Sequence, residues 1–543
     1  MPLSPIPFRH AGIAALLIAI TINSVHAAPD ADPVLTLAEG HLRLEARLRK
    51  MGIGADKPFS MPASIDTARQ IKKATQGSER IARPGQVVGL VVRFRSPDVQ
   101  ALSARNAPPP DALVAQLNSV AGGELSYQRA MSMGFHVFRF ATPKPLSEAG
   151  AILERLRALP EIEQVTEDLR TSRDLTPNDV AFPTQWNMQS VYTYGGAANL
   201  PSAWTMTTGS ASTVVAVIDT GITAHPEFQS RILPGYDFIS DPVNANDGNG
   251  RDSDASDPGD WTAKHECGYG EPAYTSSWHG THVTGIIAAA GNNWSGMAGV
   301  NWRTRILPVR VLGKCGGSVS DIIDGMLWAV GLEVPGVPTN PNPAQVLNLS
   351  LGGWSPSGCT SAYEEALNRV RATGALVVAA AGNDDNESAY VVPAACEGVM
   401  TVGAIDHDGY RASYSNYSVV NAVSVSAPGG DISYYGTDGS GIYSTVNSGT
   451  KGPVASSYAY YQGTSMAAPH VSGIAALALA QDPQISPELL YYSIYLSSHD
   501  FPRDSICSSY AETYLLCGAG IADAYQTLLT VMGLQPYLLV TEY

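Results

Sequence analysis

Charged residues and long apolar runs are both scarce in this chain of 543 residues. Asp, Glu, Lys and Arg make up only 15% of it, with 49 acidic against 33 basic side chains and a formal net charge of -16. An excess of negative charge disfavours nucleic acid and anionic membranes as partners, because both attract basic surfaces. No apolar run reaches the roughly 18 residues that a membrane-spanning helix requires. We therefore expect no nucleic-acid partner and no membrane span.

The N-terminus has the pattern of an export signal. Arg9 and His10 precede an apolar run at residues 11–22, and Val25-His26-Ala27 offers small residues at the cleavage positions. A buried N-terminal helix is the alternative, but polar residues follow the run at once. We expect a signal peptide at residues 1–27, cleavage after Ala27, and a secreted protein.

Cysteine is rare and absent from the first 266 residues of the chain. None of the six cysteines lies before Cys267, and no CxxC spacing occurs, so we expect no zinc site. Export permits disulfides, although six cysteines allow about 15 pairings. Their order along the chain suggests the pairs Cys267–Cys315, Cys359–Cys396 and Cys507–Cys517.

Residues 28–173 contain a compact unit at about 85–170 in which strand and helix patterns alternate. Their order, β-α-β-β-α-β, is that of a split βαβ domain. The polar residues 171–177 fit neither this pattern nor the one that follows, so they are a candidate processing site. We expect strands at residues 87–95, 125–131, 135–140 and 162–167, and helices at 111–120 and 146–159.

Residues 174–543 follow a different pattern, in which short apolar strands alternate with helices. Continuous apolar strands of this kind are buried on both faces, which predicts an α/β fold with a doubly wound parallel sheet and helices on both sides. We expect buried strands at residues 214–218, 306–312, 346–349, 376–380 and 399–402, and helices at 318–330, 362–373 and 465–480.

Polar residues whose side chains could take part in catalysis lie where these elements begin or end. Asp219 ends a buried strand, and binding sites in open α/β sheets form at the carboxyl ends of strands. His279 opens a helical run and has the pKa range of a general base, which a carboxylate such as Asp219 can orient. Each residue also has an ordinary alternative: Asp219 as a turn cap, and His279 with His282 as a metal-binding pair.

Ser465 and Asn383 complete the set of candidate catalytic residues. Ser465 opens the helical run through Ala480, and a nucleophilic serine needs such a rigid backbone under an exposed hydroxyl. Pro469 then has to lie in the first turn, where no amide donor is needed. Asn383 follows a buried strand and has an amide that can donate to a developing oxyanion. The alternatives are an ordinary helix cap for Ser465 and a turn residue for Asn383.

Four motifs together resemble the subtilisin-like serine endopeptidases over about residues 178–529. They are Asp-Thr-Gly from Asp219, His-Gly-Thr-His-Val-x-Gly from His279, Ala-Ala-Gly-Asn to Asn383, and Gly-Thr-Ser-Met-Ala-Ala-Pro-His around Ser465. The order Asp, His, Ser is that of subtilisin. The resemblance implies that Asp219, His279 and Ser465 form a catalytic triad with Asn383 as oxyanion donor. It also implies a secreted enzyme of the Gram-negative bacterial type, made as an autoprocessed zymogen.

The same resemblance extends to partners and substrate. Residues 28–173 are similar in layout to a propeptide that acts as intramolecular chaperone and inhibitor. Ser350, Leu351 and Gly352 match one substrate-binding segment of the family and Gly317 the facing one, so an extended peptide would pair between them. We expect a monomer that cleaves protein or peptide substrates broadly, with large apolar side chains preferred.

Structural Ca²⁺ is the one cofactor that the sequence suggests. Residues 246–254 are rich in the carboxylate and amide oxygens that calcium prefers, but they lack the glycine and terminal glutamate of an EF-hand. A solvated acidic loop is the alternative there. The resemblance implies a second site, where Glu227 replaces the usual aspartate. The candidate ligands are Asp247, Asp252 and Asp254 in the loop, and Asp179, Glu227 and Asn293 in the second site.

Two other functions remain in view. A catalytically silent subtilisin-fold binding protein is the first, although all four chemical positions are filled. An esterase is the second, but that class expects a G-x-S-x-G elbow and the chain order Ser, Asp, His. The sequence therefore favours a serine endopeptidase that works through an acyl-enzyme intermediate.

Overall fold

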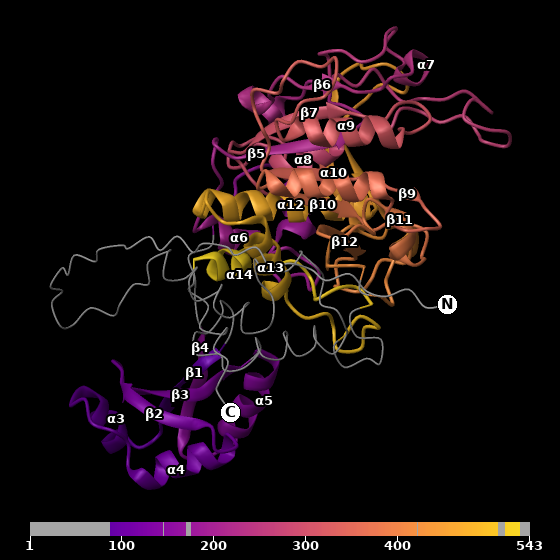
Figure 1. Ribbon diagram of the computed structural model, residues 1–543. Helices are drawn as coiled ribbons and strands as arrows, with labels where there is room; N and C mark the ends of the chain where they lie inside the picture. The colour runs from indigo at the N-terminus through magenta and orange to yellow at the C-terminus, as the bar shows by residue number, and fades with distance from the viewer. Residues whose placement is uncertain (1–86, 145, 170–174, 421, 509–515, 533–543) are drawn as a thin grey trace, which may run out of the picture. The chain divides into compact units, whose positions relative to one another are not determined.

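The computed structural model describes residues 87–144, 146–169, 175–420, 422–508 and 516–532 (Figure 1). The predicted signal peptide and residues 171–174 of the predicted processing site lie outside the described residues.

An antiparallel sheet of four strands, in the order β2-β3-β1-β4, forms the first described unit. The predicted order of strands and helices is confirmed, except that two helices rather than one separate β1 from β2. Pro97 starts the unpredicted helix, because a first-turn position needs no amide donor. The elements are β1 (Val87–Phe94), α3 (Pro97–Ala104), α4 (Asp111–Val120), β2 (Leu125–Ala130), β3 (Phe135–Lys144), α5 (Leu146–Arg157) and β4 (Ile162–Leu169).

A sheet of seven strands, in the order β13-β12-β10-β8-β5-β7-β6, is the centre of the second unit, and all its pairs are parallel. The five predicted strands all belong to it. Two edge strands, β6 and β13, were not predicted. The strands are β5 (Val214–Asp219), β6 (Tyr236–Asp237), β7 (Arg305–Arg310), β8 (Val346–Leu349), β10 (Leu376–Ala380), β12 (Val399–Ile405) and β13 (Val425–Pro428).

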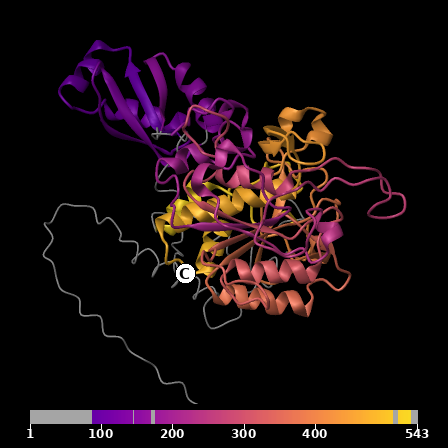
Figure 2. The same ribbon diagram turned by 90° about the horizontal axis from the view of Figure 1, so that it is seen from above.

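Helices cover both faces of this sheet (Figure 2). Alternate residues of β5 divide between two cores: Val215 and Val217 pack in one, Ala216 and Ile218 in the other. The first core lies under α6 (Leu200–Trp204), α8 (His279–Ala288), α12 (Thr464–Gln481), α13 (Pro487–Ser497) and α14 (Ala524–Val531). The second lies under α9 (Val319–Ala329) and α10 (Ser361–Ala372). The predicted doubly wound α/β fold is confirmed.

Short elements in the long loops complete this unit. Two antiparallel pairs, β9 with β11 and β14 with β15, lie outside the main sheet. The remaining elements are α7 (Pro242–Ala245), β9 (Gly353–Trp354), β11 (Val391–Val392), α11 (Ile432–Tyr435), β14 (Ile442–Asn447) and β15 (Ser456–Tyr461), with 3-10 turns η1 (Phe182–Thr184), η2 (Trp186–Met188), η3 (Pro226–Arg231), η4 (Ser388–Tyr390) and η5 (Asp438–Ser440).

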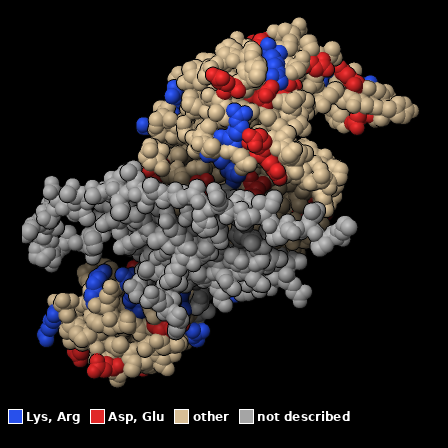
Figure 3. Space-filling view, viewed as in Figure 1, with Lys and Arg blue, Asp and Glu red and all other residues tan. Residues whose placement is uncertain are grey.

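All three predicted disulfides are present: Cys267–Cys315, Cys359–Cys396 and Cys507–Cys517. Within the described ranges, no helix combines the length and apolar character that crossing a membrane would take. On the face shown in Figure 3, the acidic and basic side chains of the second unit lie beside one another rather than in separate fields.

Candidate active site

Asp219 and His279 meet at the carboxyl end of the parallel sheet. Asp219 is the last residue of β5, and His279 is the first of α8. The imidazole Nδ1 lies 2.8 Å from Oδ1 and 3.0 Å from Oδ2 of Asp219. The carboxylate is fully buried, whereas the side chain of His279 is 22% exposed. This geometry fixes Nδ1 towards the carboxylate and leaves Nε2 for another partner.

The environment of His279 favours its protonated form. Burial of the ring lowers its pKa, but the charge of Asp219 and its hydrogen bond outweigh burial, so the pKa of His279 is raised overall. Asp219 therefore stabilises the positive charge that His279 carries after it accepts a proton.

Ser465 lies in the first turn of α12, with a half-buried side chain. Its hydroxyl donates to the carbonyl oxygen of Ser350 at 3.1 Å. Among the described residues, no hydrogen bond joins Ser465 to His279. The segments that precede these two residues do touch, because the Tyr461 hydroxyl donates to the carbonyl oxygen of Ser277 at 2.8 Å. Catalytic hydrogen bonds often form only when substrate binds.

The proline of the serine motif has a different place from the predicted one. Pro469 is the sixth residue of α12 and lies inside the helix, so its predicted first-turn position is wrong. A proline there cannot donate to the carbonyl four residues earlier, that of Ser465. The Ser350 hydroxyl donates to that carbonyl instead, at 2.8 Å. The proline thus leaves the Ser465 carbonyl without a helical donor. The bond from Ser350, which directly follows β8, connects the start of α12 to the end of that strand.

Asn383 has its amide oriented by the residue before the serine. The backbone amide and hydroxyl of Thr464 donate to Asn383 Oδ1 at 2.8 and 2.9 Å. With the amide oxygen engaged, the amide nitrogen remains as a donor. The backbone amide of Ser465 is a first-turn donor of α12, and such amides have no partner within their helix.

Asn383 and Ser465 line one pocket together with predicted substrate-binding residues. Its wall includes Leu351 and Gly352, whereas Ser350 contributes through its contacts to Ser465 and Gly317 is not part of the lining. The other lining residues are Gly353, Trp354, Ala380, Gly382, Asp384, Val391 and Thr464.

The predicted calcium residues fall into two separate places. Asp179 accepts from the backbone amides of Asn292 and Asn293 at 2.6 and 3.4 Å, and Glu227 accepts from Met297 and from the Tyr458 hydroxyl at 3.1 and 2.7 Å. Both carboxylates are buried, and Glu227 Oε2 has no hydrogen-bond partner. Asn293 Oδ1 accepts from the backbone amide of Ser295 at 2.9 Å.

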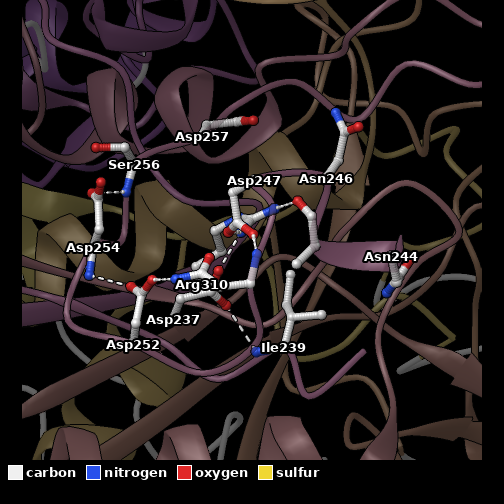
Figure 4. A network of polar contacts seen from close by, with 12 residues as sticks. Asp237, Ile239, Asn244, Asn246, Asp247, Asp252, Asp254, Ser256, Asp257 and Arg310 are labelled. Atoms are coloured by element: carbon white, nitrogen blue, oxygen red, sulfur yellow. Dashed lines mark hydrogen bonds and ion pairs between the residues drawn. The ribbon is translucent and has the colours of Figure 1, made fainter. Parts of the chain in front are cut away.

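The acidic loop is organised around an arginine instead (Figure 4). Arg310, at the end of β7, is buried and pairs with Asp237 and with Asp247, the latter at 2.7 Å. Asp252 and Asp254 accept from the backbone amides of Asp254 and Ser256 at 2.6 and 3.0 Å. Throughout the described ranges, no three His, Cys, Asp or Glu side chains are grouped so that they could hold a metal ion.

Sequence reasoning missed several residues that hold this site together. Thr220, Asp257 and Asp260 contact the segments beside Asp219 and His279, as described below. Their role depends on tertiary contacts between segments far apart in the chain. Only Thr220 belongs to one of the quoted motifs, and that motif does not show which groups its hydroxyl contacts.

Comparison with known proteins agrees with this geometry. Residues 210–507 match the sequence model of the subtilase family. The chain belongs to this family and is a subtilisin-like serine protease, as the sequence motifs predicted.

Two relatives are similar over most of their length. An extracellular protease of Xanthomonas campestris pv. campestris is 43% identical over 423 residues, which cover 78% of this chain and 67% of the relative. An extracellular basic protease of Dichelobacter nodosus is 39% identical over 432 residues, with the same shares of 78% and 67%. A solved protease structure from Pseudoalteromonas arctica has 46% identity and a TM-score of 0.61, and the match covers 66% of this chain and 100% of that one.

Proposed function

We propose that this protein is a secreted serine endopeptidase that hydrolyses peptide bonds through an acyl-enzyme intermediate, with Asp219, His279 and Ser465 as its triad. The observation that carries the proposal is the contact of 2.8 Å between the imidazole of His279 and the buried carboxylate of Asp219. A carboxylate so placed selects the tautomer of the base and stabilises its cation.

The reaction would proceed in two stages. The Ser465 hydroxyl exchanges its bond to Ser350 for one to His279 Nε2, gives up its proton there and attacks the peptide carbonyl. The Asn383 amide and the backbone amide of Ser465 donate to the oxyanion. His279 then returns the proton to the leaving amine, and water, activated in the same way, releases the acyl group.

The pocket beside Ser465 supports a preference for large apolar side chains. Its volume is about 200 Å³, more than the roughly 150 Å³ of a cavity that holds benzene. Leu351, Val391 and Trp354 supply apolar wall, whereas Asp384 is the acidic lining residue. Backbone on either side of the pocket would pair with an extended peptide, which supports protein substrates and broad cleavage.

Maturation is proposed to remove residues 28–173 as an inhibitory propeptide after export. The sheet β2-β3-β1-β4 has its own buried core, with Leu90, Val92 and Phe94 at 0% exposure, and precedes the family match. A unit with a separate core can fold by itself and serve as a chaperone.

A serine-directed phosphonate probe and mass spectrometry of the secreted protein test function and maturation together. We expect the wild type to lose its N-terminal segments and to carry the label on Ser465. Ser465→Ala should stay full-length and unlabelled, because no acyl-enzyme can form. Normal processing of Ser465→Ala in a protease-free host would contradict autoprocessing. A folded wild type that takes no label would favour the silent binding protein.

Calcium is proposed at Asp179 and Glu227. The unpartnered Glu227 Oε2 fits a cation. Burial and the charge of Asp179 raise the pKa of Glu227, and the hydrogen bonds that lower it do not offset them. A hard divalent cation with oxygen ligands would relieve that repulsion. The residues Asp247, Asp252 and Asp254 do not fit, because Arg310 and backbone amides already engage their carboxylates.

Thermal unfolding of the Ser465→Ala protein in CaCl₂ and in a chelator tests this site without reference to activity. We expect calcium to raise the Tm, since a ligand that binds only the folded state stabilises it. Glu227→Gln should abolish the increase, whereas Asp252→Asn should keep it. If Asp252→Asn abolished the increase and Glu227→Gln kept it, calcium would bind to the acidic loop instead.

A further inference from the structure

The turn Asp257-Pro258-Gly259-Asp260 contacts the backbone on both sides of His279. Asp260 accepts two hydrogen bonds from Ser277, one from its backbone amide and one from its hydroxyl, both at 2.6 Å. Ser277 lies two residues before His279. Between them, Trp278 is buried and has φ 50°, and its indole donates to the carbonyl oxygen of Gly449 at 2.7 Å. Hydrogen bonds to Asp260 and Gly449, neither of which belongs to α8, thereby fix the two residues that precede His279.

Asp257 reaches the other side of His279 through Thr220. The Thr220 hydroxyl donates to Asp257 Oδ2 at 2.8 Å and accepts from the backbone amide of Gly280 at 3.0 Å. The backbone amide of Thr220 donates to Asp219 Oδ1 at 2.7 Å. One threonine thus connects the carboxylate that holds His279 with the residue that follows it, and Asp257 fixes the direction of its hydroxyl.

The turn packs closely against the loop that contains Lys451. Gly259 has φ +100°, and a Cβ at this position would lie 2.0 Å from the carbonyl oxygen of Lys451. Only glycine fits such a close approach at positive φ. The Ser276 hydroxyl donates to the same carbonyl, so the turn and the start of α8 rest on one loop.

Charges from several elements face the imidazole. The carboxylates that act on it are Asp219 of β5 and Asp260 and Asp257 of the turn, and all three raise the pKa of His279. His282 of α8 and Tyr461 of β15 are the other titratable neighbours, and Arg310 of β7 acts on Asp257. Burial raises the pKa of Asp257 to about 7, so this carboxyl is only partly charged at neutral pH. Of the turn's two carboxylates, Asp260 raises the pKa of His279 more than Asp257 does.

We propose that Asp260 is a positioning residue for His279, which it holds through Ser277 while its negative charge stabilises the protonated imidazole, with Asp257 fixing the opposite side through Thr220. This inference rests on the proposed function, in which His279 is the general base. Asp260 would thus support the triad without contacting substrate. It acts through its hydrogen bonds to Ser277 and through the electrostatic effect of its charge on His279.

Asp260→Asn separates charge from shape, since asparagine keeps an acceptor for Ser277. The control is Asp241→Asn, which removes the same charge from an exposed helix cap where asparagine caps equally well. The first readout is the titration of ¹³C-labelled histidine in the Ser465→Ala background, with His279 assigned by substitution. The second is the acid limb of kcat/KM against pH in the active enzyme, which reports the base of the free enzyme.

We expect Asp260→Asn to move both the imidazole titration and the acid limb to lower pH, by a few tenths of a unit to about one unit. Asp241→Asn should move neither. An unchanged titration in Asp260→Asn, or an equal shift in both variants, would overturn the proposal. If Asp260→Asn does not fold, Asp260→Glu and Asp260→Gln provide the same comparison at equal size. Failure of the proposed function is distinguishable, because the folded wild type would then take no phosphonate label, whereas failure of this inference leaves labelling of the wild type intact.

Discussion

At the residue scale, the orientation of the Asn383 side-chain amide depends on Thr464, the residue that precedes the predicted nucleophile. Two donors of Thr464 hold its amide oxygen, and Asn383 lines the same pocket as Ser465. A free asparagine amide would sample both orientations, and only one offers a donor to an oxyanion. The Gly-Thr-Ser motif therefore supplies the orientation of the oxyanion donor as well as the nucleophile.

Asn383→Ala should lower kcat by about 10²- to 10³-fold with little change in KM, a magnitude that comes from the corresponding asparagine of subtilisin. Thr464→Val should cause a smaller loss of the same kind, because the backbone amide still holds Asn383. Steady-state kinetics on one peptide substrate measure both, with Thr464→Ser as the control that keeps the hydroxyl. A rise in KM at constant kcat would instead mean that Asn383 binds the ground state.

At the element scale, the strands that could be predicted are those of four or more residues with a mainly aliphatic sequence. Strands β5 and β10 are buried on both faces and are apolar in sequence, apart from Asp219 at the end of β5. The four residues of β8 are also buried and include one polar residue, Asn348. The strand β6 has two residues, too few for any pattern, and β13 ends in a proline. The hairpin of β14 and β15 lies in a segment rich in Tyr, Ser and Gly, where stacking of Tyr443 on Tyr458 replaces an apolar pattern.

The site residues that could be predicted from the sequence are those at the ends of predictable strands and helices. Asp219 and Asn383 follow predictable strands, and parallel strands bring their carboxyl ends to one edge. Asp257 and Asp260 lie in a long polar loop with no periodicity, and their partners Thr220 and Ser277 are defined only by the fold. Arg310 lies inside the strand predicted at residues 306–312, whereas in the fold it ends β7 and pairs with Asp247 of the acidic loop.

At the scale of the whole molecule, two buried histidines make the folded state sensitive to acid. His282 and His470 are at 0% exposure. His282 Nε2 lies 3.1 and 3.2 Å from the carbonyl oxygens of Ile442 and Ala459, and His470 contacts Asn187 and Met466 at 2.8 Å each. Burial lowers the pKa of His282 to about 3 and that of His470 to about 4. Both rings are therefore neutral in the folded protein under conditions in which a solvated histidine is protonated.

The direction of the pH effect follows from proton binding. In the unfolded chain both histidines titrate near ~6.5, so between that value and the folded pKa values the unfolded state binds more protons. The free energy of unfolding then rises with pH across this window, by at most about 1.4 kcal/mol per pH unit for each ring, and is lost as the pH falls from about 6.5 towards 4. Unfolding rather than activity has to be measured, because His279 also titrates.

We expect the denaturant midpoint of the Ser465→Ala protein to decrease as the pH is lowered from 7 to 4.5. His282→Gln in the same background should reduce the change of the midpoint per pH unit, even where it lowers the midpoint itself. His265→Gln, at an exposed loop position, is the matched control and should leave the slope unchanged. The carboxylates of the molecule contribute equally to all three proteins, so only the difference between slopes reports the buried ring. Equal slopes in His282→Gln and His265→Gln would mean that His282 does not bind its proton preferentially in the unfolded state, and the acid sensitivity would then have to come from other groups.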